Sequence, residues 1–178
     1  MSRSIGGRDR PPKAGLTSMA RGIQSILFVC LGNICRSPLA EGVMRHKLQL
    51  AGLGEQVRLD SCGTGPWHVG NPPDRRSVGI ARQHGIAMDD LRARKVRRQD
   101  FYEFELILAM DRDNLADLQA IQPRDGIAEL ALYLDYCEVA DDLGFDEVPD
   151  PYYGGDRGFG AVYAMIDRAS DFLIARCR

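Results

Sequence analysis

A cysteine and an arginine lie six positions apart in residues 30–37 (CLGNICRS), and a serine follows the arginine directly. A five-residue loop that closes onto a helix N-terminus can turn several backbone N–H groups inward and form a cradle for an anion. The planar guanidinium of Arg36 matches two oxygens of a phosphate group. Cys30 would place its sulfur at the centre of the cradle, where the positive field and the Ser37 hydroxyl stabilise the nucleophilic thiolate. The segment therefore predicts attack of Cys30 on a phosphoryl group, with no metal required.

The cysteines of this segment have three other interpretations. Cys30 can be a small core residue at the end of a strand. Cys30 and Cys35 can be zinc ligands, but no matching Cys/His pair follows at a suitable spacing. They can also be a redox couple, but four intervening residues do not make the C-x-x-C pattern. The position between an apolar run (25–29) and an amphipathic segment (37–51) favours the nucleophile.

Cleavage of a phosphate ester also needs a proton for the leaving oxygen. Our candidate for the donor is Asp150, within residues 148–155 (VPDPYYGG). The prolines on either side favour extended backbone, which suits a residue that overhangs a site. Tyr152 and Tyr153 would form an aromatic wall against a substrate ring. Asp111 is the alternative donor, but its position fits a helix cap better.

Apolar runs and amphipathic segments alternate along the chain, which is typical of a parallel α/β sheet. We expect strands at 25–29, 56–61, 105–110 and 127–134, and helices at 37–51, 73–84, 112–121 and 156–176. Ligands bind such sheets at the carboxyl ends of the strands, near the switch point of the strand order. The turn at 30–37 follows the first strand and is therefore where we expect the site.

The composition of the chain indicates its domain organisation, its compartment and the kinds of partner to expect. Residues 1–22 contain few large apolar side chains and predict a disordered tail before one domain at 23–178, and Met19 is an alternative start. The five cysteines are an odd number and no secretory signal precedes them, which indicates a reducing, cytoplasmic compartment. A net charge of −2 favours no nucleic-acid partner, and no apolar run reaches the roughly 18 residues of a membrane span.

Three separated motifs together point to one family. They are VCLGNICRSPLAEG, then SCGTGPWHVG with PPDRRSVGIARQHGI, and finally DPYYGG. From about Ser25 to the C-terminus, the chain resembles the low-molecular-weight protein tyrosine phosphatases. The resemblance implies a single flavodoxin-like domain (phosphatase I type), with a four-stranded parallel sheet and helices on both faces. It also implies hydrolysis of phosphotyrosine through a phosphocysteine intermediate on Cys30, with Asp150 as acid and then base, and no cofactor.

The resemblance further implies roles for the residues around this centre. Asn33 would support the shape of the loop, together with the supporting residues Ser61, His84 and Asp111. The residues implied to bind substrate are Leu31, Gly32, Asn33, Ile34, Cys35, Ser37, Trp67, His68, Tyr152 and Tyr153. The partners would be phosphotyrosine-containing proteins, and the chain would be mostly monomeric with weak self-association.

Other functions on the same fold remain open. A thiol-coupled arsenate reductase needs two further cysteines near the site, and the sequence has none between Cys62 and Cys137. A phosphoarginine phosphatase typically has threonine in place of Ile34. A non-catalytic phosphopeptide-binding module would usually lack one of Cys30, Arg36 and Asp150, and all three are present. We therefore favour the tyrosine phosphatase.

Overall fold

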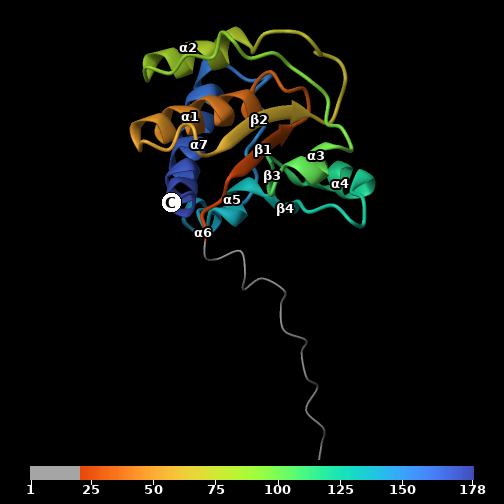
Figure 1. The fold of residues 1–178 in the computed structure, drawn as a ribbon. Coiled ribbons are helices and arrows are strands. Elements are labelled where there is room, and N and C mark those ends of the chain that lie inside the picture. Colours follow the sequence, from red (N-terminus) through yellow and green to blue (C-terminus); the bar gives the residue numbers. More distant parts are fainter. Residues whose placement is uncertain (1–20) are drawn as a thin grey trace, which may run out of the picture.

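The structure, a computed structural model, describes residues 21–178 (Figure 1). Its strands are β1 (Ser25–Cys30), β2 (Arg58–Gly63), β3 (Leu106–Ala109) and β4 (Glu129–Leu132). Its helices are α1 (Arg36–Leu50), α2 (Arg75–Gln83), α3 (Asp100–Glu103), α4 (Arg112–Ile121), α5 (Tyr133–Tyr136), α6 (Ala140–Leu143) and α7 (Asp156–Arg176). The predicted alternation of strands and helices is confirmed.

The four strands form one parallel sheet in the order β2-β1-β3-β4. All six residues of β1 are buried, as expected for a central strand covered on both faces. The strand order reverses at β1, because β2 lies on one side of it and β3 on the other. The turn that leaves β1 therefore lies at the switch point, where open α/β sheets bind their ligands.

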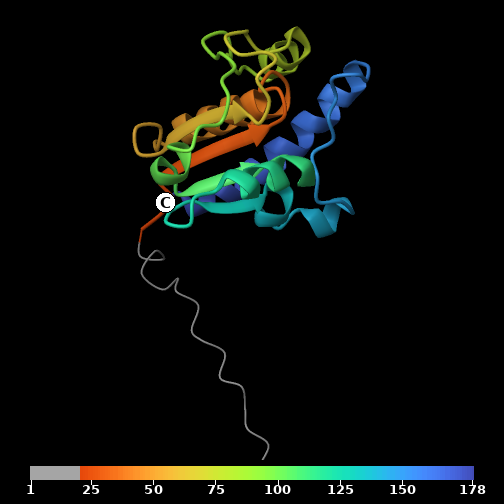
Figure 2. The same cartoon turned by 90° about the vertical axis from the view of Figure 1, so that its right-hand side faces the viewer.

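Helices cover both faces of the sheet, as Figure 1 and the perpendicular view in Figure 2 show. Side chains alternate along β1, so Ile26 and Phe28 join the core beneath α1 and α7, whereas Leu27 and Val29 join the core beneath α3 and α4. Each large apolar side chain buried in this way contributes about 1.5–3 kcal/mol relative to an exposed one. The predicted four-stranded sheet with helices on both faces is confirmed.

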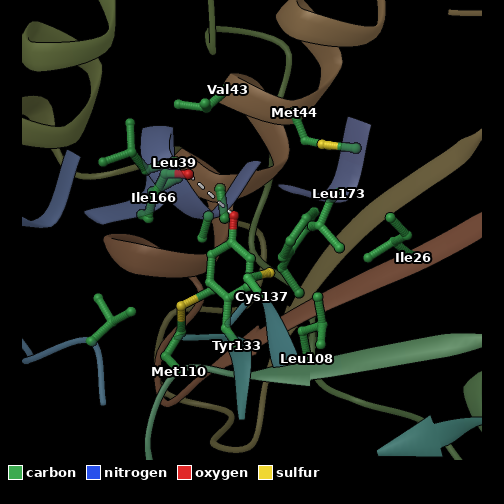
Figure 3. Packing of buried hydrophobic residues seen from close by; sticks show 14 of the residues in the cluster. Ile26, Leu39, Val43, Met44, Leu108, Met110, Tyr133, Cys137, Ile166 and Leu173 are labelled. Carbon is green, nitrogen blue, oxygen red and sulfur yellow. Dashed lines mark hydrogen bonds between the residues drawn. The ribbon is translucent and has the colours of Figure 1, made fainter. Parts of the chain in front are cut away.

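The predicted fourth strand was too long. Strand β4 ends at Leu132, and Tyr133 begins α5 instead of continuing the strand. The buried Tyr133 ring lies among side chains of α1, β3 and α7, including Leu39, Leu108 and Leu173 (Figure 3). Its hydroxyl is 2.9 Å from Ser170 Oγ. Packing against α7, which the local pattern does not show, ends the strand.

The predicted second strand was displaced by two residues. Gln56 lies in a turn, where its N–H donates to the Leu53 carbonyl, and β2 begins at Arg58. The strand continues to Gly63, whose N–H donates to the Arg94 carbonyl and whose carbonyl accepts from Val96 N–H. This pairing extends β2 toward the turn after β1.

The two ends of the described chain lie close together, because Ile23 N–H donates to the Arg176 carbonyl. Arg21 donates to a carboxylate oxygen of Glu105 over 2.6 Å, so the residues just before β1 are attached to the domain. The predicted tail as far as residue 20, including Met19, lies outside the described residues. None of the helices within residues 21–178 has the length and apolar character needed to cross a lipid bilayer.

Candidate active site

The turn between β1 and α1 (residues 30–36, the phosphate loop) wraps around the Cys30 sulfur. Ser37 Oγ lies 3.0 Å from Cys30 Sγ, and the backbone N–H of Asn33 donates to the same sulfur over 3.3 Å. Asn33 has φ 56°, a left-handed conformation that Asn tolerates better than most residues. This conformation turns its N–H toward the sulfur, as expected for one of the inward-facing amides predicted from residues 30–37.

The side chain of Asn33 holds the loop to its surroundings. Its Nδ2 donates to Ser37 Oγ (2.8 Å) and to Ser61 Oγ (3.0 Å), and its Oδ1 accepts from the backbone N–H of Arg94 (3.0 Å). The supporting positions implied for Asn33 and Ser61 therefore fit the structure. The contribution of Arg94 was missed, because it comes from a backbone group and has no signature in the sequence.

Glu41 is a second residue that sequence analysis missed. It is buried on α1, and Ser61 Oγ donates to its Oε2 over 2.6 Å. Burial raises the pKa of Glu41 to about 7, although the hydrogen bond from Ser61 opposes that rise. Glu41 lies one helical turn after Ser37, but its contact with the loop passes through Ser61 of β2, which the local sequence does not show. A chain of hydrogen bonds thus runs from Cys30 to a buried carboxyl group.

Arg36 is the buried cation of the site. Its Nη1 donates to Asp111 Oδ2 (2.6 Å) and to the Val148 carbonyl (3.0 Å). Burial disfavours the charged guanidinium, but the negative charges of Cys30 and Asp111 more than offset this, so the pKa of Arg36 is raised. Arg36 therefore carries a permanent positive charge beside Cys30.

Asp111 has two structural roles. Besides accepting from Arg36, it is the N-cap of α4, because its Oδ1 accepts from Asn114 N–H over 2.8 Å. The predicted helix cap is confirmed. The implied supporting position is also consistent with the structure, since Asp111 orients the guanidinium of Arg36.

Asp150 lies in the segment after Val148 (residues 148–155, the acid loop). Its Oδ2 is 3.5 Å from Arg36 Nη2, and its Oδ1 accepts from Tyr152 N–H over 3.1 Å. The side chain is about two-fifths exposed, so it faces the opening of the site. A carboxyl group placed there can exchange a proton with a molecule held against Cys30.

A cavity of about 440 Å³ opens above the Cys30 sulfur. It is lined by Cys30, Leu31, Gly32, Ile34, Cys35, Arg36, Trp67, His68, Asp150, Tyr152 and Tyr153. The structure thus brings together residues from three separate parts of the sequence. Trp67 (69% exposed) and Tyr153 (96% exposed) form an exposed aromatic rim on this cavity. Their exposure favours contact with a flat ring.

His84 does not belong to this cluster, and the structure corrects the implied supporting role. The residue is exposed at the C-terminus of α2, and its ring stacks on Tyr163 of α7 with centroids 3.9 Å apart. Gly85, at φ 74°, ends the helix at this point. The presence of His84 in a family-like motif was not enough to predict where its side chain lies.

Cys35 lines the cavity but differs chemically from Cys30. Burial is the main cause that raises its pKa to about 12, and the charges of Asp74 and Cys30 add to the effect. Cys35 is therefore protonated near neutral pH and is a poor nucleophile. No group of three or more His, Cys, Asp or Glu side chains within residues 21–178 is arranged to hold a metal ion.

Residues 25–178 match the family model described as low molecular weight phosphotyrosine protein phosphatase. The chain belongs to this family. A family member from Schizosaccharomyces pombe is 44% identical over 158 residues, covering 87% of this chain and 97% of the relative. A crystal structure of a protein tyrosine phosphatase from Entamoeba histolytica has a TM-score of 0.79 and 39% identity, covering 85% of this chain and 95% of that chain. A crystal structure of a Drosophila arginine phosphatase has a TM-score of 0.77 and 32% identity, covering 84% and 95%.

Proposed function

We propose that this phosphatase-family chain hydrolyses phosphotyrosine in proteins, with Cys30 as nucleophile, Arg36 as phosphate ligand and Asp150 as general acid and base. The observation that carries the proposal is that these three side chains line one cavity with an exposed aromatic rim. Membership of the family supports the reaction class.

The reaction proceeds in two displacements at phosphorus. The Cys30 thiolate forms a P–S bond as the bond between phosphorus and the tyrosine oxygen breaks, and Asp150 transfers its proton to that oxygen. The Asp150 carboxylate then accepts a proton from water, whose oxygen attacks phosphorus and breaks the P–S bond. Inorganic phosphate leaves, and the thiolate is restored. The Asn33 N–H and the Ser37 hydroxyl, which contact Cys30 Sγ, stabilise the departing thiolate.

The loop amides and Arg36 bind the phosphoryl oxygens through both steps. Asp111 and Val148 hold the Arg36 guanidinium in place before any ligand arrives. The guanidinium therefore does not have to reorient during the reaction. The remaining implied ligands, Leu31, Gly32, Ile34 and Cys35, belong to the same loop. We assign Trp67, His68, Tyr152 and Tyr153 to the ring and flanking residues of the substrate.

Phosphoarginine is the second candidate substrate, because of the likeness to the Drosophila arginine phosphatase. Ile34 lines the cavity and offers no hydroxyl group to a guanidinium, which favours phosphotyrosine. Cys62 and Cys137 are buried, which argues against passing a disulfide out of the site as a thiol-coupled arsenate reductase does.

We also propose a cytoplasmic protein that is mostly monomeric, with weak self-association, acting on phosphoproteins and not on nucleic acid or a membrane surface. Free thiols at all five cysteines suit a reducing compartment. Size-exclusion chromatography coupled to light scattering tests the oligomeric state, and labelling in intact cells tests the location.

Hydrolysis of a phosphotyrosine peptide in EDTA tests the function, with phosphoserine and phosphoarginine measured alongside. We expect turnover of phosphotyrosine that Cys30→Ser abolishes and Asp150→Ala strongly reduces. Activity that survives Cys30→Ser would refute the nucleophile. Faster turnover of phosphoarginine than of phosphotyrosine would transfer the proposal to the second substrate, and phosphate binding without turnover would indicate a binding module.

A further inference from the structure

We propose that Arg76 is a positioning residue that holds the acid loop, and with it Asp150, over the phosphate loop. This rests on the role of Asp150 proposed above. Nothing in the three motifs marks Arg76 as part of the reaction. The inference comes from contacts that join three segments far apart in the sequence.

Arg76 binds the acid loop through both ends of its guanidinium fork. Nη1 donates to the Gly154 carbonyl over 3.1 Å, and Nη2 donates to the Tyr152 carbonyl over 3.0 Å. The guanidinium also lies over the ring of Phe159, 4.5 Å from its centroid, and 5.7 Å from that of Tyr152. A planar fork satisfies two carbonyls at fixed separation, which the single ammonium of lysine cannot reproduce.

The other side of Arg76 is attached to the phosphate loop through Asp74. Asp74 caps α2, with Oδ1 accepting from the backbone N–H of Arg76 (2.8 Å) and from its Nε (3.0 Å). The Nη2 atom donates to Asp74 Oδ2 over 3.0 Å. The backbone N–H of Asp74 donates to the Ile34 carbonyl over 2.8 Å. A continuous path of hydrogen bonds thus connects the loop that binds phosphate to the loop that carries the acid.

The acid loop depends on this attachment. At its start, Val148 is fixed on both sides, because its N–H donates to the Met110 carbonyl and its carbonyl accepts from Arg36. Within the described part of the chain, both hydrogen bonds that reach residues 151–154 from outside the loop come from Arg76, and the next one along the chain joins Gly158 N–H to the Gly155 carbonyl at the start of α7. Residues 152–155 are exposed, and Asp150 lies between the Val148 and Arg76 anchors. Loss of the Arg76 anchor would leave residues 151–154 with no hydrogen bond from outside the loop.

A purely structural Arg76 predicts something different from a positioning Arg76. If Arg76 only packs α2 against α7, its substitution lowers the stability of the protein and the rates with both substrates by the same factor. If it positions the acid, the loss falls on the step that needs the proton. A good leaving group such as nitrophenolate needs that proton less than phenolate does, so the two substrates separate the alternatives.

The experiment compares kcat/KM for phenyl phosphate and p-nitrophenyl phosphate in wild type, Arg76→Gln and Arg76→Lys. Arg75→Gln, a change at the neighbouring exposed arginine, is the matched control. We expect Arg76→Gln to lower kcat/KM for phenyl phosphate about tenfold, which is a fraction of the 10²–10⁴ typical of a general acid. The kcat/KM for p-nitrophenyl phosphate should change by less than about twofold, and so should the inhibition constant of inorganic phosphate. Arg76→Lys keeps the charge but not the fork, and should show the same pattern if Arg76→Gln folds poorly.

Asp150→Ala and the double variant with Arg76→Gln complete the test. In the absence of the acid, we expect Arg76→Gln to have no further effect, because the two residues act on one step. Equal losses on both substrates, or additive losses in the double variant, would overturn the proposal for Arg76 alone. An Asp150→Ala variant with full rate on phenyl phosphate would overturn the proposed acid and the role of Arg76 with it.

Discussion

Glu41 makes the stability of this protein depend on pH in a direction opposite to that of most carboxylates. The group is buried, and burial raises its pKa from the usual 4.5 to about 7. The hydrogen bond from Ser61 lowers it, the nearby charges of Asp60 and Asp90 raise it, and that of Arg45 lowers it. The folded state therefore holds a proton on Glu41 over a pH range in which the unfolded chain has lost it.

The magnitude follows from linkage. Because the folded-state pKa is the higher one, the contribution of Glu41 to stability is fully present below pH 4.5 and is lost as the pH rises to about 7. At about 1.4 kcal/mol for each pH unit between 4.5 and about 7, the difference amounts to about 3.5 kcal/mol at most, and we expect about 2–3 kcal/mol between pH 5 and pH 8. Glu41→Gln removes the titration but keeps the shape of the side chain and its acceptor for Ser61.

Urea unfolding of wild type and Glu41→Gln between pH 5 and pH 8 measures this difference. We expect the two proteins to have similar free energies of unfolding near pH 5. As the pH rises to 8, the free energy of unfolding of the variant should increase relative to that of wild type by about 2–3 kcal/mol. Other titrating groups contribute to both proteins and cancel. Glu55→Gln, at an exposed carboxylate in the turn after α1, is the matched control for the substitution itself. A difference between wild type and Glu41→Gln that stays constant with pH would refute the reasoning.

Three further predictions concern the cradle. Asp111→Asn keeps one oxygen for the α4 cap but turns an amide NH₂ toward the donor Arg36, so the guanidinium loses its orientation. A raised inhibition constant for phosphate and a lower unfolding free energy are expected. Iodoacetate at neutral pH should modify Cys30 and leave Cys35 intact by mass spectrometry, since the pKa of Cys35 is about 12; modification of both would contradict this. Gly63→Ala places a Cβ 2.6 Å from the Leu31 carbonyl oxygen, so it should lower kcat/KM for aryl phosphates about tenfold or more. Gly79→Ala is the control and should leave kcat/KM unchanged, because the added Cβ meets no atom within 4 Å.

The sheet and the position of the candidate site were predictable because each has a local signature. The apolar run of β1 and the spacing from Cys30 to Arg36 place the candidate nucleophile at a switch point without any knowledge of the rest. The supporting residues were harder to predict from the sequence, because they act through long-range contacts. Arg94 contributes a backbone N–H, and Glu41 reaches the loop through Ser61. His84 lies in a family-like motif, yet tertiary packing directs it to α7.

The position of Arg94 fixes the orientation of the Asn33 side-chain amide. Its backbone N–H can only donate, so the Asn33 oxygen must face it and the Asn33 Nδ2 must face Ser37 and Ser61. Ser37 Oγ then accepts from Asn33, so its own proton has two acceptors within reach, the Cys30 sulfur at 3.0 Å and the Cys62 carbonyl at 3.3 Å. A hydroxyl that can turn its proton from a carbonyl to the sulfur is available to stabilise a thiolate there. The backbone of the segment beside β2 thus orients the Asn33 side chain, and through it the acceptor side of Ser37.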